Sequence, residues 1–134
     1  MDLFARGDVE LGSSQCQVTP FFVPKKNGML RLIIDTRNAG RWFHDPPYTS
    51  LAAAEAISSI EGVHGERLMK KQSDVECCFY KFELIAALRP FFGLPVVDGD
   101  TLTAGDWRRL GMEPTPGSMP FRLRVVSMGW SWAV

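Results

Sequence analysis

The sequence lacks several features that would place it in a specialised class of protein. Its 15 lysines and arginines balance 15 aspartates and glutamates over 134 residues, so it is not a strongly basic protein of the kind that binds nucleic acid through its net charge. No apolar run approaches the roughly 18 residues of a membrane helix, and the first residues, MDLFARGDVELG, contain no apolar core of a secretory signal. Hydrophobic residues nevertheless make up 46%, which excludes disorder throughout. We therefore expect one globular core and no association with a membrane.

Cysteine is also scarce. Cys16, Cys77 and Cys78 are an odd number of cysteines, and they include no Cys-x-x-Cys motif of a structural zinc site. Such usage is typical of reduced thiols inside the cell. We therefore expect an intracellular protein without a disulfide framework.

The charges are balanced overall but are placed unevenly along the chain. Residues 21–43 contain five bases and one acid, for a formal charge of +4, whereas residues 44–66 contain four acids and no lysine or arginine. A basic patch can therefore form locally, and the alternative is an ordinary solvated surface.

The segment VTPFFVPKKNGMLRLIIDTR predicts a β-hairpin. Apolar runs at residues 18–23 and 29–34 flank PKKNG, in which Asn27-Gly28 tolerates the positive φ angles of a type I′ turn. This arrangement would present positive charge at a hairpin tip. The basic residues of the segment are Lys25 and Lys26 at the tip, Arg31 in the returning strand and Arg37 just beyond it.

Further elements are expected downstream of the hairpin. PPYTSLAAAEAISSIEG predicts a helix near residues 50–60. Residues 67–73 predict a short strand that ends at Asp74. Residues 87–97 and 119–130 predict an antiparallel pair of strands, and the Gly- and Pro-rich segment between them predicts a long loop or an inserted hairpin extension. The expected fold class is therefore α+β.

Asp74 lies where the predicted strand meets an aromatic and thiol cluster, CCFYKF. An isolated carboxylate in that position is a candidate metal ligand. An Asp that caps the following helical turn is the commoner alternative.

Taken in order, three stretches resemble the fingers and the first half of the palm of a reverse transcriptase, the RNA-directed DNA polymerase of retrotransposon-type elements. VPKKNGMLRLIIDTRNAG resembles the fingers hairpin, with lysines at its tip and a basic strand that ends in Asp-x-Arg. SDVECCFYKFEL resembles the first palm motif, an Asp followed five residues later by an aromatic. PFRLRVVSMGWSWAV resembles a palm strand and its glycine-containing turn. The chain departs from the family at Gly40, where Asn is usual, and at Ser127-Met128, where Pro-Phe or Pro-Gln is usual.

The resemblance implies a partial fingers–palm polymerase fold with an antiparallel sheet and packed helices. Residues 1–17 would be an N-terminal extension, and residues 18–66 would form the fingers-like hairpin and helix. Residues 67–134 would form a partial palm, interrupted by an insertion at about residues 96–118.

The family's reaction joins a primer hydroxyl to the α-phosphorus of a deoxynucleoside triphosphate, and two Mg²⁺ ions held by carboxylates stabilise the charge that develops. By the resemblance, Asp74 is the catalytic carboxylate, and Asp74 and the Val75 backbone carbonyl are Mg²⁺ ligands. Phe79 would be the aromatic gate beneath the sugar. Core packing is the alternative role for Phe79 and for Trp130. The other implied nucleotide-binding residues are Lys25 or Lys26, Arg31, Met128 and Gly129, and the implied template contacts are Arg37 and Trp130.

The family's other palm carboxylates, in a Tyr-x-Asp-Asp-like hairpin, have no counterpart in these 134 residues. We therefore expect a reverse transcriptase fragment that is inactive as the isolated chain, with an RNA or DNA template–primer and deoxynucleoside triphosphates as partners. One alternative is a non-catalytic nucleic-acid-binding remnant of a retroelement that uses the basic hairpin. Another is an unrelated small α+β protein with no nucleic-acid role.

Overall fold

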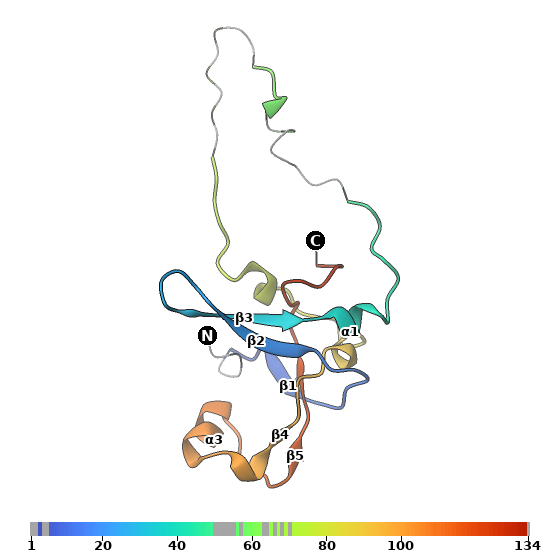
Figure 1. Cartoon of the computed structure of the whole chain (residues 1–134), viewed down its shortest axis with the longest axis vertical. Coiled ribbons are helices and arrows are strands. Elements are labelled where there is room, and N and C mark those ends of the chain that lie inside the picture. The colour runs from blue at the N-terminus through green and yellow to red at the C-terminus, as the bar shows by residue number, and fades with distance from the viewer. Residues whose placement is uncertain are drawn as a thin grey trace.

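The β-rich runs of the sequence fold into short antiparallel strands in a computed structural model of the chain, which is a small mixed α/β structure (Figure 1). The described residues are 3, 6–49, 56, 58–62, 65, 67, 69 and 71–133. Within them are three two-stranded antiparallel sheets, two α-helices and three short 3₁₀ turns. No helix of the described part is long and apolar enough to cross a bilayer.

The hairpin predicted around PKKNG is confirmed. β2 (Thr19–Pro24) and β3 (Leu30–Asp35) pair antiparallel over their full length, from Thr19 opposite Asp35 to Pro24 opposite Leu30. In Figure 1 this hairpin crosses the middle of the molecule, and its turn projects beyond the other strands. α1 (Arg37–Gly40) follows directly after β3.

The turn of this hairpin differs from the type I′ turn that Asn27-Gly28 predicts. Gly28 has a φ of 76°, but Asn27 is not among the positive-φ residues. The Gly28 N–H donates to the Lys25 carbonyl at 3.0 Å, and the Lys25 N–H donates to the Met29 carbonyl at 2.7 Å. This pattern is typical of a three-residue loop in which glycine supplies the single left-handed position.

The antiparallel pairing predicted between residues 87–97 and 119–130 is also confirmed. β4 (Val97–Asp98) pairs with β5 (Ser118–Met119). The ladder continues where the Leu94 N–H donates to the Phe121 carbonyl at 2.8 Å. The same segment also pairs with the N-terminal part of the chain, because β6 (Phe121–Leu123) forms an antiparallel pair with β1 (Val9–Leu11).

The insertion is more regular than the loop that its composition predicts. α3 (Ala104–Leu110) begins at a capping box, in which Thr103 and Asp106 exchange hydrogen bonds, and it ends at Gly111 in the left-handed conformation. Trp107 then packs on Met119 and Phe121 in a small core of its own. The segment TAGDWRRLG contains a capping box and a C-terminal glycine, which are the start and stop signals of a helix. The glycines and prolines on either side favour a loop, which is why composition predicts a loop here.

The main core lies where β1, β3, β6 and the C-terminal segment meet. Its central residues are fully or almost fully buried, among them Phe92 and Leu123 at 0% exposure. Trp130 packs edge-on against Phe92, with ring centroids 4.9 Å apart. The buried members of this core are Val9, Val18, Ile34, Ala39, Leu84, Phe92, Leu123 and Trp130.

Two expected elements have a different outcome. The helix near residues 50–60 falls largely outside the described residues. The strand expected over residues 67–73 is absent from the described members of that range, which lack regular structure. The reason is composition, because four of the five described residues in this range are polar, and all five are exposed. Regular structure resumes in the 3₁₀ turn η1 (Cys78–Lys81). A second such turn, η2 (Arg89–Phe91), precedes β4.

Candidate nucleic-acid interface

The two faces of the β2–β3 hairpin differ in what they contact. Directly opposite residues of an antiparallel pair share a face, so Arg31 shares one with Val23, and Ile33 shares it with Phe21. Ile34 points to the other face, where it is 2% exposed in the core. The face that carries Arg31 is therefore the one left available to a ligand.

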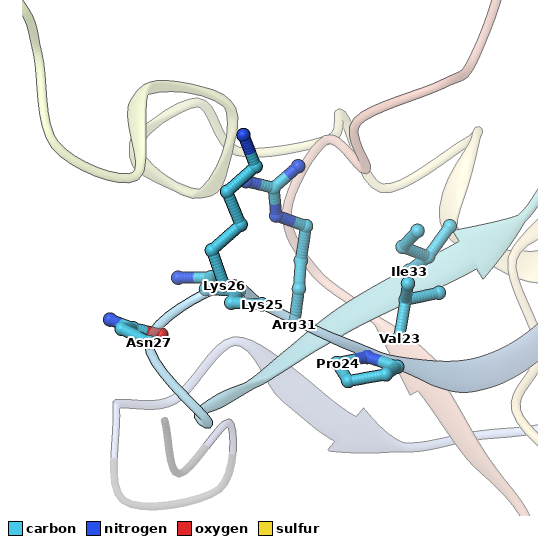
Figure 2. Close-up of a pocket in the computed structure, with 7 residues that line it drawn as sticks. All are labelled: Val23, Pro24, Lys25, Lys26, Asn27, Arg31 and Ile33. Carbon is cyan, nitrogen blue, oxygen red and sulfur yellow. The ribbon is translucent and has the colours of Figure 1, made fainter.

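A hollow of about 540 Å³ lies on the hairpin near its tip. Its basic lining residues are Lys25, Lys26 and Arg31, and their side chains project from the ribbon around it (Figure 2). All three are exposed, and no acid among the described residues forms an ion pair with them. The hollow thus combines unneutralised positive charge with an apolar floor, formed by Val23, Pro24 and Ile33.

A second hollow, of about 170 Å³, joins the hairpin to distant parts of the chain. Arg31 lines it from β3, Tyr80 from η1, and Met128 and Gly129 from the C-terminal turn. Three residues that the resemblance assigns to nucleotide binding, Arg31, Met128 and Gly129, therefore lie around one site.

The Gly129 turn is fixed to the end of β3. The Thr36 hydroxyl donates to the Gly129 carbonyl at 3.2 Å, although the two residues are 93 positions apart. Gly129 has a φ of 101°, a conformation that residues with a side chain rarely adopt. A side chain at this position would therefore strain the turn that borders the hollow.

Arg37 is exposed but already has a carboxylate partner. Its Nη2 lies 2.6 Å from Oδ2 of Asp35, and its Nε donates to both carboxylate oxygens at 3.0 Å. Hydrogen bonds from the Arg37 side chain and backbone lower the pKa of Asp35 to about 2. Both residues line a third hollow, of about 340 Å³, with Met128 and Gly129. The positive charge of Arg37 is thus partly neutralised at the predicted template-binding position.

Tyr80 is a site residue that the sequence did not single out. Its neighbour Phe79 was expected beneath the sugar, but Phe79 is half-buried and does not line any of the three hollows, whereas Tyr80 lines the second one. Burial raises the pKa of Tyr80, and the nearby Cys77 and Asp8 raise it further. The signal for this residue was only its position in the aromatic cluster CCFYKF.

Asp74 and Val75 lie apart from these hollows. Both are exposed in a segment without regular structure, and neither lines the hollows around Arg31 and Gly129. The described residues contain no group of three His, Cys, Asp or Glu side chains placed to hold a metal. Asp74 therefore belongs to no such group in the described part, and a Mg²⁺ site of the two-metal kind needs several carboxylates.

Trp130 lies in the core rather than at the surface. Its side chain is 8% exposed and packs against Phe43 and Phe92. Its ring is therefore covered by protein, as the alternative role of a core anchor predicts.

The comparisons with known proteins add no relative. No protein-family model and no curated protein sequence matches the chain.

Proposed function

We propose that the chain binds nucleic acid and deoxynucleoside triphosphates through the β2–β3 hairpin and the Gly129 turn, as the fingers and first palm segment of an RNA-directed DNA polymerase. The observation that carries this proposal is the hollow in which Arg31 meets Met128 and Gly129. Three motifs far apart in sequence led to the resemblance, and residues from all three stretches line this one site.

The chemistry of the hairpin supports phosphate binding. A guanidinium group pairs well with phosphate oxygens through charge-assisted hydrogen bonds, and two lysines beside it add positive charge with flexible reach. The exposed Phe21 side chain, on the same face of the hairpin as Arg31, offers apolar surface to nucleobases. Contacts between the phosphates and the basic side chains of the hairpin tip would position a nucleic-acid strand without selecting its sequence.

Binding and catalysis are separate parts of this proposal. Mg²⁺ would be the cofactor of the complete polymerase, but no step of the reaction through Mg²⁺ is assigned to this chain, because Asp74 belongs to no group of three possible metal ligands in the described part. That observation favours a second candidate function, a nucleic-acid-binding remnant without catalysis. The two candidates share the hairpin and differ at Asp74.

The decisive experiment measures binding with matched variants. A fluorescent template–primer and a fluorescent deoxynucleoside triphosphate are titrated with the 134-residue chain and with Arg31→Ala. Loss of the guanidinium–phosphate contact should weaken both affinities about tenfold. The control is Arg108→Ala, which removes an equal charge from the exposed face of α3 and should change neither affinity.

The same preparation tests whether this chain catalyses primer extension. Added Mg²⁺ and all four deoxynucleoside triphosphates should give no primer extension by the chain alone. Binding without extension fits a segment that contributes contacts but not the full carboxylate set. Extension that disappears in Asp74→Asn would instead assign catalysis to this chain. Equal binding by wild type and Arg31→Ala would contradict both candidates and favour the unrelated α+β protein.

A further inference from the structure

Cys77 and Cys78 are adjacent free thiols at the start of η1. Cys77 is exposed and Cys78 is partly buried. The backbone of Cys77 is left-handed, with φ 53° and ψ 37°, and Cys77 is the one non-glycine residue of the described chain with a positive φ. Such a conformation is disfavoured for an L-residue, and strained backbone is concentrated at functional and switching sites.

The third cysteine provides an internal comparison. The Cys16 thiol donates a hydrogen bond to the Phe91 carbonyl at 2.9 Å. Burial raises the pKa of this thiol, so less of the reactive thiolate is present. The Cys77 side chain, in contrast, is exposed to solvent. An oxidant should therefore reach Cys77 well before Cys16.

We propose that Cys77 and Cys78 form a redox-sensitive dithiol. A low-molecular-weight disulfide oxidises this dithiol to a disulfide bond between the two adjacent cysteines. The Cys77 thiolate attacks one sulfur of that reagent, which forms a mixed disulfide and releases one thiolate. The Cys78 thiolate then attacks the Cys77 sulfur and expels the second small thiolate. The two protein thiols are oxidised, their two protons pass to the released thiolates, and the reagent is reduced to two thiols.

The geometry of adjacent cysteines makes this bond reversible. Consecutive Cα atoms lie about 3.8 Å apart, which is less than the roughly 4.4–6.8 Å that most disulfides span. The closed ring is therefore strained, and strained disulfides are reduced more readily than structural ones. A dithiol of this kind responds to oxidation without locking the chain permanently.

Ring closure would act on the second hollow through η1. The Tyr80 N–H donates to the Cys77 carbonyl at 3.0 Å, so the backbone that must change on ring closure holds the residue that lines the hollow. Tyr80 lines that hollow together with Arg31 and Gly129. Oxidation should therefore alter the surroundings of these residues, whatever ligand the hollow takes.

The test uses oxidised glutathione and mass spectrometry of the whole chain and its peptides. Wild type should lose two hydrogen atoms in the peptide that holds Cys77 and Cys78, leave Cys16 unmodified, and regain the hydrogens with dithiothreitol. Cys78→Ser, which lacks the second thiol, should instead keep a glutathione adduct on Cys77. Amide NMR signals of Tyr80 and Gly129 should shift on oxidation of wild type, and they should not shift in Cys77→Ser/Cys78→Ser.

Three results would overturn the proposal. A stable glutathione adduct on Cys77 of wild type would show that Cys78 cannot reach the mixed disulfide. Modification of Cys16 at the same rate as Cys77 would remove the selectivity. A vicinal disulfide that forms without any shift at Tyr80 would separate the dithiol from the hollow.

Discussion

Basic side chains have opposite surroundings in two regions of the molecule. Where β1 and β6 pair, three arginines converge on Glu10, and two of them also lie within 3.1 and 3.8 Å of Glu83. At the β2–β3 tip, Lys25, Lys26 and Arg31 have no acidic partner among the described residues. In the first region the positive charge is paired with carboxylates of the fold, whereas in the second region it is available to a ligand. The arginines of the first region are Arg89, Arg122 and Arg124, at 2.9, 2.7 and 3.7 Å from Glu10.

The Glu10 network joins elements that are distant in sequence. Glu10 belongs to β1, Arg122 lies opposite it in β6, and Arg89 reaches it from η2. Arg89 also donates to the Leu84 carbonyl at 2.9 Å. These contacts hold the strands around the core, and they neutralise the charge of the arginines there.

The largest expected effect comes from breaking the network. Glu10→Ala leaves three partly buried guanidinium groups facing one another without their shared carboxylate. We expect the free energy of unfolding to fall by about 2 kcal/mol, less than for a fully buried pair because these side chains retain some solvent. Urea denaturation measures this loss.

Two observations accompany that measurement. Glu113→Ala, which removes an exposed carboxylate near the end of the insertion, is the control and should leave stability unchanged. Folded Glu10→Ala should still bind nucleic acid as wild type does, because the hairpin is untouched. Equal stability of Glu10→Ala and Glu113→Ala would show that the network contributes nothing to the fold.

A smaller effect is expected from releasing Arg37. Asp35→Asn removes the carboxylate that partly neutralises Arg37, so the affinity for single-stranded nucleic acid should rise about twofold to threefold. Because the folded pKa of Asp35 is about 2, below its ordinary value, its ion pair stabilises the fold above about pH 4 and is lost as the pH falls toward 2. The variant should therefore lack this part of the acid dependence. Affinity by fluorescence anisotropy and stability between pH 2 and 5 check both outcomes, and an affinity lower than wild type would contradict the account.

The sequence predicted the local elements better than the arrangement of the site. Asn27-Gly28 between two apolar runs was enough to locate the hairpin, because turn chemistry and β propensity are local properties. The turn type was wrong, since a two-residue and a three-residue loop both place Gly28 in the left-handed region. The helix α3 was missed, although Thr103 and Asp106 form a capping box, because glycine and proline on either side favoured a loop.

The site depends on contacts that no local pattern contains. The hydrogen bond from Thr36 to Gly129 and the entry of Tyr80 into the same hollow are long-range packing outcomes. The family resemblance assigns Arg31, Met128 and Gly129 to one nucleotide-binding site, and these three residues line one hollow. It does not place Phe79 or Asp74 beside them, and the burial of Trp130 follows from ring packing that its sequence position does not reveal.

The salt dependence of single-stranded nucleic-acid binding tests the central claim most directly. Lys25→Gln/Lys26→Gln removes two charges from the hairpin tip, and Arg108→Gln/Arg109→Gln removes two from the exposed face of α3. Each phosphate neutralised on a single strand contributes about −0.7 to the slope of log affinity against log salt concentration. The hairpin variant should therefore lose about 1.4 from the magnitude of that slope, and the α3 variant should keep the wild-type slope. Equal slopes for the two variants would contradict the claim that the unneutralised charge of the hairpin is the nucleic-acid-binding surface.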